Sequence, residues 1–236
     1  MLPYTLASGE NGHPGFTTWG TDFGIPNSNP LQPTVLTLSL GTLQPANPMP
    51  PVALPDSPPY GSTFWDQWVR YFVTRDPSFD PLALDPQNPG PWQARIVELT
   101  GIQDANRTDY SAFQDKGGKV LMAHGTHDAL VGHRATQQLM RRLTETMGAG
   151  NVANFLRYYE IPGYGHSVST VFNAAWDSLT ALEQWVEQGV APPAQVVADS
   201  AGVPGRTRPL CEYPTWPRYN GSGDVNVAGS FTCVAD

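Results

Sequence analysis

The 236-residue sequence is poor in charged residues, and in lysine most of all. Asp, Glu, Lys and Arg make up 14% of the chain, the formal net charge is −8, and lysine occurs only at Lys116 and Lys119. An acidic chain without a basic run attracts a phosphate backbone poorly, so we expect no nucleic-acid partner. Long apolar runs are missing as well. Because no stretch approaches ~18 apolar residues, we expect no membrane partner.

Cysteine is scarce too, with Cys211 and Cys233 as its only two positions. No histidine lies near either of them in the sequence, which excludes a zinc ribbon. Their spacing alone leaves two interpretations open, a pair of free thiols or one disulfide that closes the C-terminal segment. Residues 1–15 have neither a basic stretch nor a long apolar core, so we do not interpret them as a signal peptide.

Proline is concentrated in the first part of the chain, since most of the 24 prolines lie at or before Pro91. A segment such as Pro45–Pro59 cannot hold a long helix or a central strand. We therefore predict that residues 1–92 are irregular, with one short helix at Phe64–Phe72. The aromatic side chains of that helix allow two interpretations. They pack onto a neighbouring domain, or they form a lid over a substrate cleft.

From Asp104 the hydrophobic pattern becomes regular and predicts an α/β fold. Two strands alternate with two helices, at Lys119–His124, His133–Met147, Phe155–Ile161 and Ser169–Gln188. Alternation of this kind is typical of a parallel sheet covered by helices. Beyond Ala191 the chain turns polar again, and we predict an irregular surface segment there.

Two residues suited to catalysis follow the predicted strands. Asp128 comes after the first strand, in His-Gly-Thr-His-Asp, and His166 after the second, in Gly-Tyr-Gly-His. Loops at the same edge of a parallel sheet lie close together, so we expect a hydrogen bond between Asp128 and His166. Their chain order matches the acid and the base of a Ser–His–Asp triad. His124, His127 and His133 crowd the first loop, but no Glu or Cys completes a metal-ligand spacing, and we expect no metal site.

The serine nucleophile of such a triad is not found in the sequence. No serine lies in a G-x-S-x-G elbow, which must pass directly into a helix. The nearest match is Ser39, in Thr-Leu-Ser-Leu-Gly, but the proline-rich residues after it exclude a helix. Both cysteines follow His166, so neither is placed for the role. We therefore expect the acid and the base without the nucleophile.

Three segments resemble the tannase and feruloyl esterase family. Residues 104–131, DANRTDYSAFQDKGGKVLMAHGTHDALV, are similar to that family's approach to its catalytic acid, with Gly-Gly-Lys, a strand and then H-G-x-x-D. Residues 161–167, IPGYGHS, are similar to its histidine loop. Residues 208–233, RPLCEYPTWPRYNGSGDVNVAGSFTC, are similar to its closing segment. The resemblance covers more than half of the chain.

The resemblance implies a secreted or periplasmic serine carboxylic ester hydrolase that cuts galloyl- or feruloyl-type aromatic esters. It implies a partial α/β-hydrolase fold, with the C-terminal strands and helices of the parallel sheet and an irregular, proline-rich lid segment. Residues 1–92 would be part of the lid insertion, 93–190 the C-terminal part of the core, and 191–236 a tail closed by a Cys211–Cys233 disulfide. Asp128 is then the catalytic acid residue and His166 the base.

The chain departs from the family pattern at two points. Ser167 stands where the family has a cysteine bridged to one beside its nucleophile, so that bridge cannot form. The family's nucleophile, oxyanion hole and calcium loop lie upstream of anything present here, and we expect no cofactor. We predict the C-terminal part of an esterase, inactive alone, whose partners are a small aromatic ester and either the missing N-terminal half or a second copy. A remnant that binds phenolic ligands and one subunit of a two-chain esterase stay open as alternatives.

Overall fold

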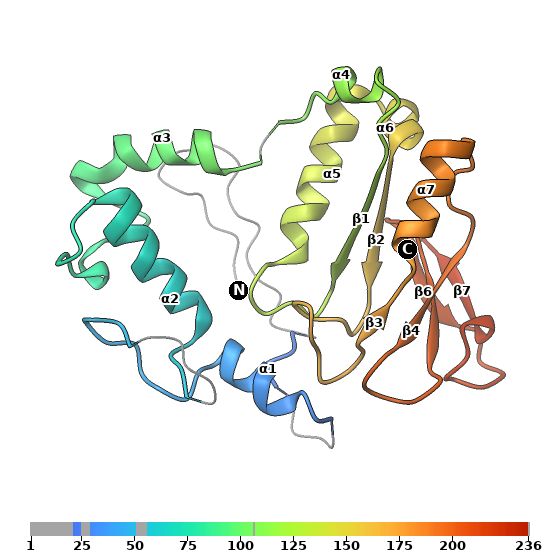
Figure 1. The fold of residues 1–236 in the computed structure, drawn as a ribbon, viewed down its shortest axis with the longest axis horizontal. Helices are drawn as coiled ribbons and strands as arrows, with labels where there is room; N and C mark the ends of the chain where they lie inside the picture. Colours follow the sequence, from blue (N-terminus) through green and yellow to red (C-terminus); the bar gives the residue numbers. More distant parts are fainter. Residues whose placement is uncertain (1–20, 25–28, 51–55, 106, 236) are drawn as a thin grey trace.

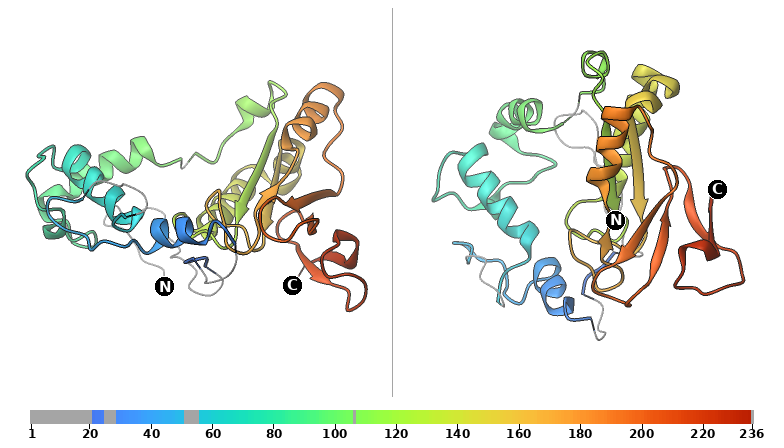
Figure 2. Two further views of the ribbon diagram at one scale, coloured as in Figure 1. Left: turned by 60° about the horizontal axis from the view of Figure 1, so that its bottom comes forward. Right: turned by 45° about the vertical axis from the view of Figure 1, so that its right-hand side comes forward.

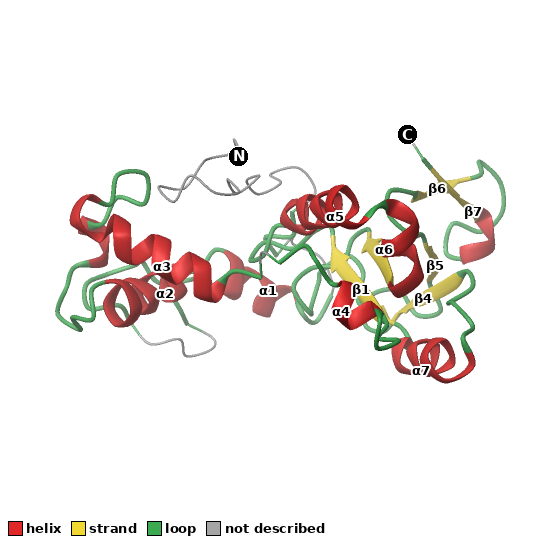
Figure 3. Ribbon diagram, turned by 90° about the horizontal axis from the view of Figure 1, so that it is seen from above, coloured by secondary structure: helices red, strands yellow, loops and turns green. Residues whose placement is uncertain are grey.

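A computed structural model describes residues 21–24, 29–50, 56–105 and 107–235. Within these ranges the chain has two parts that lie side by side (Figures 1 and 3). A helical part contains α2 and α3, and an α/β part contains the strand pair β1–β2 and the strands that follow it. Our interpretation of residues 1–20 as irregular lies outside the described residues. In the described part, no helix is both long and apolar enough to cross a membrane.

The helical part surrounds a small apolar cluster. Its elements are α1 (Gln32–Ser39), α2 (Tyr60–Gln67), the π-helix η1 (Trp68–Val73), the 3-10 turns η2 (Pro81–Ala83) and η3 (Gly90–Trp92), and α3 (Gln93–Gln103). The buried side chains of the cluster come from η1, α3 and the connection between them: Val69, Val73, Leu84, Ile96 and Leu99. Four partly buried aromatic side chains pack against the cluster: Trp65, Trp68, Phe79 and Trp92.

The helix predicted at Phe64–Phe72 is confirmed, although it begins at Tyr60 and continues to Val73. The expectation that it is the only helix before residue 93 is wrong, because α1 forms as well. A proline in the first turn of α1 does not disturb it, since an N–H at that position has no partner within the helix in any case. The later prolines do keep residues 40–50 free of helix.

The α/β part is centred on two parallel strands, β1 (Val120–Gly125) and β2 (Leu156–Ile161), which are joined through α5 (His133–Met147) and α6 (Ala149–Phe155). A short helix, α4 (Ser111–Gln114), precedes β1. The strands are paired from Val120 opposite Leu156 to Gly125 opposite Ile161. Helix α5 lies on one face of the pair and α7 on the other (Figure 3). Both predicted strands, the helix between them and their parallel arrangement are confirmed.

Burial on both faces explains why both sets of alternating positions in β2 carry apolar or aromatic side chains. Leu156 and Tyr158 pack with Leu143 of α5 on one face. Tyr159 and Ile161, which alternate with them, pack with Phe172 and the strands of the C-terminal segment on the other face. The two carboxyl ends of the strands point to the same edge of the molecule, where α1 also lies (Figures 1 and 2).

The helix predicted to begin at Ser169 begins nine residues later, as α7 (Ser178–Gln188). Asp177 caps it by accepting a hydrogen bond from the Thr180 N–H at 3.2 Å. Ser169 is fully buried, and its hydroxyl accepts a hydrogen bond from the Val171 N–H at 3.0 Å. Such local bonds between side chains and backbone compete with helix formation. The correction moves residues 169–173 from a helix into the loop that follows β2.

The expectation of an irregular segment beyond Ala191 is also wrong. Three short antiparallel strands form a second sheet: β3 (Ala174–Ala175), β4 (Gln195–Asp199) and β5 (Thr207–Leu210). A hairpin-like pair follows, with β6 (Trp216–Tyr219), the 3-10 turn η4 (Ala228–Ser230) and β7 (Phe231–Val234). The polar composition of this segment does not predict a sheet. The sheet forms because a few inward-facing residues, such as Val197 and Leu210, are enough to give it one buried face.

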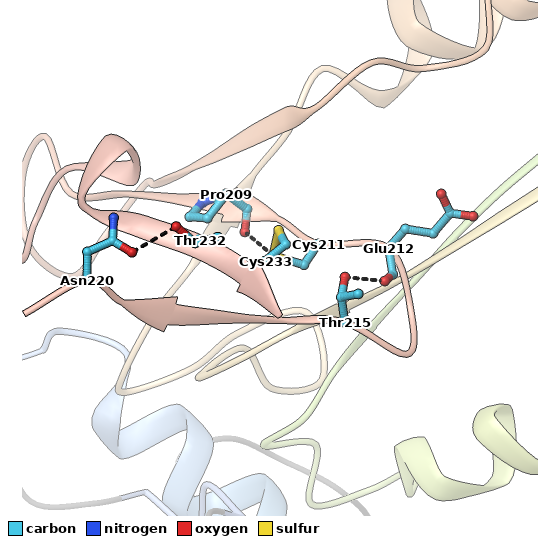
Figure 4. Close-up of a disulfide and its surroundings, with 7 residues drawn as sticks. All are labelled: Pro209, Cys211, Glu212, Thr215, Asn220, Thr232 and Cys233. Carbon is cyan, nitrogen blue, oxygen red and sulfur yellow. Dashed lines mark hydrogen bonds between the residues drawn. A yellow bond between two sulfur atoms is a disulfide. The ribbon is translucent and has the colours of Figure 1, made fainter. Parts of the chain in front are cut away.

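A disulfide joins Cys211, just after β5, to Cys233 in β7 (Figure 4), as the resemblance implies. The two Cα atoms are 5.5 Å apart and the cysteines are separated by 22 positions in the sequence. Closing a loop of this length stabilises the fold by about 3 kcal/mol in the chain-entropy account. The bridge fixes the tail beside β2, where the Tyr213 N–H donates to the Tyr158 carbonyl at 2.8 Å.

Candidate active site

The two loops that follow β1 and β2 are bonded directly to each other. We call residues 126–132 the β1 loop and residues 162–173 the β2 loop. The Thr126 N–H donates to the Ile161 carbonyl at 3.1 Å, and the His127 N–H donates to the Tyr164 carbonyl at 3.0 Å. Gly125 allows this approach, because a Cβ there would lie 2.1 Å from the Tyr164 oxygen. A side chain at this position would push the loops apart.

Asp128 and His166 meet across these loops. His166 Nδ1 lies 2.9 Å from Asp128 Oδ2, which is a hydrogen bond of ordinary length. The side chain of Asp128 is 5% exposed, whereas that of His166 is 47% exposed. The carboxylate is thus held inside the molecule, and the imidazole reaches from it toward solvent. The bond expected from the sequence is present.

The remaining contacts of Asp128 hold it in the charged form. Its Oδ1 accepts hydrogen bonds from the Leu130 and Val131 N–H groups, both at 2.8 Å, and His124 Nε2 lies 3.5 Å from Oδ2. Burial raises the pKa of the Asp128 carboxyl, but these bonds and that of His166 more than offset the effect and bring the pKa below its usual value. At neutral pH, Asp128 is therefore a carboxylate that can accept a hydrogen bond from the Nδ1–H of His166.

Because Nδ1 is engaged by Asp128, Nε2 is the atom of His166 that can exchange a proton with a ligand. The ring borders a small cavity of about 20 Å³, together with Val35, Leu38 and Ser39 of α1. That space matches a single water molecule. The apolar side chains of α1 form one wall of the site.

Ser39, the nearest match to an elbow serine, lines the same cavity as His166. It is the last residue of α1, and its hydroxyl donates to the Asp22 carbonyl at 3.3 Å. A nucleophile elbow places its serine before a helix, where backbone N–H groups can bind an oxyanion. The C-terminal end of a helix carries the opposite partial charge and disfavours an anion. The geometry of Ser39 therefore does not match that of a serine nucleophile.

Two of the three histidines near β1, His124 and His127, make hydrogen bonds within the protein. His124 Nδ1 lies 2.8 Å from the Thr136 hydroxyl and its Nε2 lies 3.0 Å from the Val131 carbonyl. The Gly163 N–H donates to His127 Nδ1 at 3.0 Å. His133 is buried at the start of α5. Over the residues that the structure describes, no three His, Cys, Asp or Glu side chains are grouped so as to hold a metal ion.

The β2 loop carries an unusual backbone conformation next to His166. Ser167 has φ 67°, in the left-handed region that residues with a Cβ rarely adopt. Position 167 is a serine, and the two cysteines of the chain are joined to each other, so no disulfide holds this loop. Strained residues of this kind cluster at ligand sites, where surrounding contacts hold them in place.

One residue of this region escaped the sequence analysis altogether. Asp22 is 1% exposed and binds the end of the β2 loop, where Thr170 donates from both its N–H and its hydroxyl. It lies in a segment without a regular hydrophobic pattern, so periodicity gives no signal there. The only local sign is Gly24, whose N–H donates to Asp22 Oδ1 at 2.9 Å in a turn of the kind that Asp favours.

A family model described as tannase and feruloyl esterase matches residues 3–234. The chain belongs to the tannase and feruloyl esterase family. Among curated relatives of this tannase-family chain is the uncharacterized esterase Atu5261 of Agrobacterium fabrum, 38% identical over 237 residues that cover the whole chain and 40% of that protein. Another is a mono(2-hydroxyethyl) terephthalate hydrolase of Piscinibacter sakaiensis, 41% identical over 56% of this chain and 22% of that protein.

Solved structures of the tannase and feruloyl esterase family agree with this assignment. Feruloyl esterase B from Aspergillus oryzae superposes with a TM-score of 0.62 and 25% identity, over 86% of this chain and 45% of that one. A tannin acyl hydrolase from Aspergillus niger has a TM-score of 0.59 over 72% of this chain and 33% of that one, and at 18% identity it supports the fold alone. The tannase-family chain therefore has an α/β-hydrolase type of fold and spans less than half the length of each of these relatives.

Proposed function

We propose that this chain supplies the acid and the base of a serine carboxylic ester hydrolase, and that the nucleophile comes from outside these 236 residues. The observation that carries the proposal is the 2.9 Å contact between the buried Asp128 carboxylate and the half-exposed His166 imidazole. Two observations support a nucleophile from outside these residues. The sequence has no G-x-S-x-G elbow, and Ser39 lies at the C-terminal end of α1.

The chemistry follows from the tautomer that Asp128 selects. With the proton on Nδ1, His166 Nε2 can remove the proton of a serine hydroxyl as its oxygen adds to the ester carbonyl. The same nitrogen then returns the proton to the departing alcohol, which leaves an acyl-enzyme. A water molecule repeats the two steps and releases the acid. The charge that develops on the imidazole is stabilised by the Asp128 carboxylate beside it.

For the substrate we propose an ester of an aromatic acid, of galloyl or feruloyl type. The names of two relatives point to such acids, ferulate in feruloyl esterase B and terephthalate in the hydrolase of Piscinibacter sakaiensis. We propose further that the protein works in an oxidising compartment, outside the cell or in a periplasm. The Cys211–Cys233 bridge supports this location, because disulfides persist mainly in such surroundings.

The unpaired edge of β1 supports a structural partner. In the described residues β1 pairs with β2 on one side, and no strand pairs with its other side. A parallel strand whose second edge is open can bind a further strand. We propose that a strand of the missing N-terminal part occupies this edge; a second copy of the chain is the alternative.

The first prediction concerns turnover of methyl ferulate and methyl gallate. The 236-residue chain should release acid no faster than buffer, because His166 has no serine to activate. A longer chain, read in frame upstream of Met1 and containing a G-x-S-x-G segment, should be active and should lose that activity on His166→Ala.

Either of two results would contradict the proposal. Turnover by the 236-residue chain that disappears with His166→Ala would show that the nucleophile is present in it. Activity of the longer chain that survives His166→Ala would remove His166 from the mechanism. Ser39→Ala is the control in both chains, because it should leave the result unchanged.

A second candidate function, binding of phenolic ligands without turnover, is favoured by one cavity of the helical part. It has a volume of about 160 Å³ and is lined by Trp65, Trp68, Ile96 and other residues of α3. The indole N–H of Trp65 donates to the Pro81 carbonyl and that of Trp68 to Gln103, so both rings are fixed. A cavity of this size suits a single aromatic ring.

The second prediction therefore concerns tryptophan fluorescence. If the helical part binds phenolic rings, ferulate or gallate should quench the tryptophan fluorescence in a saturable way. Trp68→Phe should reduce this quenching. N-acetyltryptophanamide at equal absorbance corrects for light absorbed by the ligand. No saturable quenching at about millimolar ligand would count against the binding function and leave the esterase proposal untouched.

A further inference from the structure

The β2 loop, which carries His166, is held at its two ends by hydrogen bonds to Asp22 and to His127. Asp22 holds the C-terminal end. Its Oδ1 accepts from the Thr170 hydroxyl at 2.7 Å, its Oδ2 accepts from the Thr170 N–H, and the Ser169 hydroxyl lies 2.9 Å from Oδ2. Burial raises the pKa of the Asp22 carboxyl, yet these bonds from Thr170, Gly24 and Ser169 lower it overall, so the carboxylate is charged.

Asp22 reaches the β1 loop as well. Its own backbone N–H donates to the carbonyl of His127 at 2.9 Å. His127 is the residue directly before Asp128 in the chain. One residue, Asp22, therefore connects the loop of the carboxylate with the far end of the loop of the imidazole.

His127 holds the near end of the β2 loop. Its Nδ1 accepts a hydrogen bond from the Gly163 N–H at 3.0 Å, and the Thr126 hydroxyl lies 3.1 Å from the same nitrogen. An acceptor at Nδ1 requires the neutral ring with its proton on Nε2. Burial lowers the pKa of His127, which keeps the ring neutral and Nδ1 free to accept at neutral pH.

The loop needs such support, because its own conformation is not one that a free chain prefers. Ser167, the residue directly after His166, has φ 67°, in the left-handed region that a residue with a Cβ rarely adopts. His166 itself is about half exposed, and Asp128 is its side-chain hydrogen-bond partner in the structure. Loss of either anchor would let the loop sample other conformations and would break the Asp128–His166 bond part of the time.

We propose that Asp22 and His127 are positioning residues, which hold the β2 loop from its two ends so that His166 Nδ1 stays against Asp128. The inference rests on the proposed function, since it assigns the two residues to the orientation of the same catalytic base. Neither residue touches the reacting atoms in this scheme. Each acts through the backbone of the loop.

The test uses the 236-residue chain labelled with ¹⁵N in its histidines, and it reads the tautomer and the Nδ1–H proton signal of His166 by NMR. His127→Leu removes the acceptor for Gly163 and should cost most of the hydrogen-bonded Nδ1–H signal, leaving a mixture of tautomers. His127→Asn offers its Oδ1 near the place of Nδ1 and should restore the signal. A purely structural role would lower the melting temperature in both variants without distinguishing them in this way.

A milder pair of variants covers the case in which His127→Leu does not fold. Thr170→Val removes one bond to Asp22 and should weaken the His166 signal partially. Thr144→Val is its matched control, because this exposed hydroxyl donates to Met140 within α5, away from the loops. A His166 spectrum unchanged by Thr170→Val, or by a folded His127→Leu, would overturn the inference.

The same spectra separate this inference from the function on which it rests. If His166 of the unaltered chain lacks the Nδ1–H tautomer, the proposed acid–base pair fails, whatever the variants do. If the unaltered chain shows that tautomer and the variants leave it intact, only the positioning role fails. Substrate is not needed for either outcome.

Discussion

Asp128→Asn is expected to move the proton of His166 from Nδ1 to Nε2. The asparagine oxygen should stay with the Leu130 and Val131 N–H groups, which both bind Oδ1 at 2.8 Å. The amide NH₂ then replaces Oδ2 and faces His166 Nδ1, which must become an acceptor. The proton on Nε2 stops that atom from serving as the base. In a chain that carries the nucleophile, kcat should fall by about 10⁴-fold.

Two measurements check this result independently. Nitrogen chemical shifts of His166 in the 236-residue chain report the tautomer without any substrate, and hydrolysis of methyl ferulate by the longer chain reports kcat. Asp115→Asn is the control, since Asp115 is exposed and lies outside both loops. A His166 that keeps its Nδ1 proton in Asp128→Asn would show that the carboxylate does not select the tautomer.

Asp199→Ala is expected to lower the free energy of unfolding by about 3–5 kcal/mol, the usual effect of breaking a buried ion pair. Asp199 ends β4, and its side chain is fully buried. It accepts from Arg206 and from the N–H groups of Asn173, Gly202 and Val203. The alanine variant leaves the charge of Arg206 and these N–H groups without their acceptor. Urea unfolding followed by tryptophan fluorescence measures the loss.

A fall in pH should remove part of the stability that the Asp199 carboxylate provides. Burial raises the pKa of Asp199, but the backbone N–H groups of Val203, Asn173 and Gly202 and the Arg206 guanidinium bring it down to about 2, from 3.8. A carboxyl whose pKa is lower in the folded state stabilises the fold above pH 3.8 and loses that effect as pH falls toward 2. The difference is on the order of 2 kcal/mol. Asp199→Asn should lack this acid-dependent part, and an identical pH dependence in both proteins would contradict it.

The predictable part of the fold lies where hydrophobic periodicity and local capping agree. β1, α5 and β2 follow their sequence patterns closely, and the Asp128–His166 bond follows from their order. The apolar pattern predicts too early a start for α7, because it includes Phe172 and Trp176, which lie before the helix. Residues 169–173 instead bond to Asp22 and Asp199, which lie far from them in the sequence.

The contacts that hold the β2 loop cannot be predicted from the sequence, for a physical reason. Asp22 acts through bonds to Ser169 and Thr170, about 150 residues away, and no local propensity encodes such a contact. His127 could be noticed only as one of several histidines. Its role depends on one N–H, that of Gly163, whose position is decided by the packing of β1 against β2.

The crossover from β1 through α5 to β2 also decides where an enzyme of this kind can be divided. The hydrogen bonds by which Asp22, His127 and Asp128 hold the imidazole and its loop lie between Asp22 and Thr170 of one polypeptide. A cut on the N-terminal side of this stretch separates a serine from its base without breaking any of them. A split esterase assembled from two polypeptides would then need its interface only to deliver a hydroxyl to Nε2, because the general base arrives already aligned.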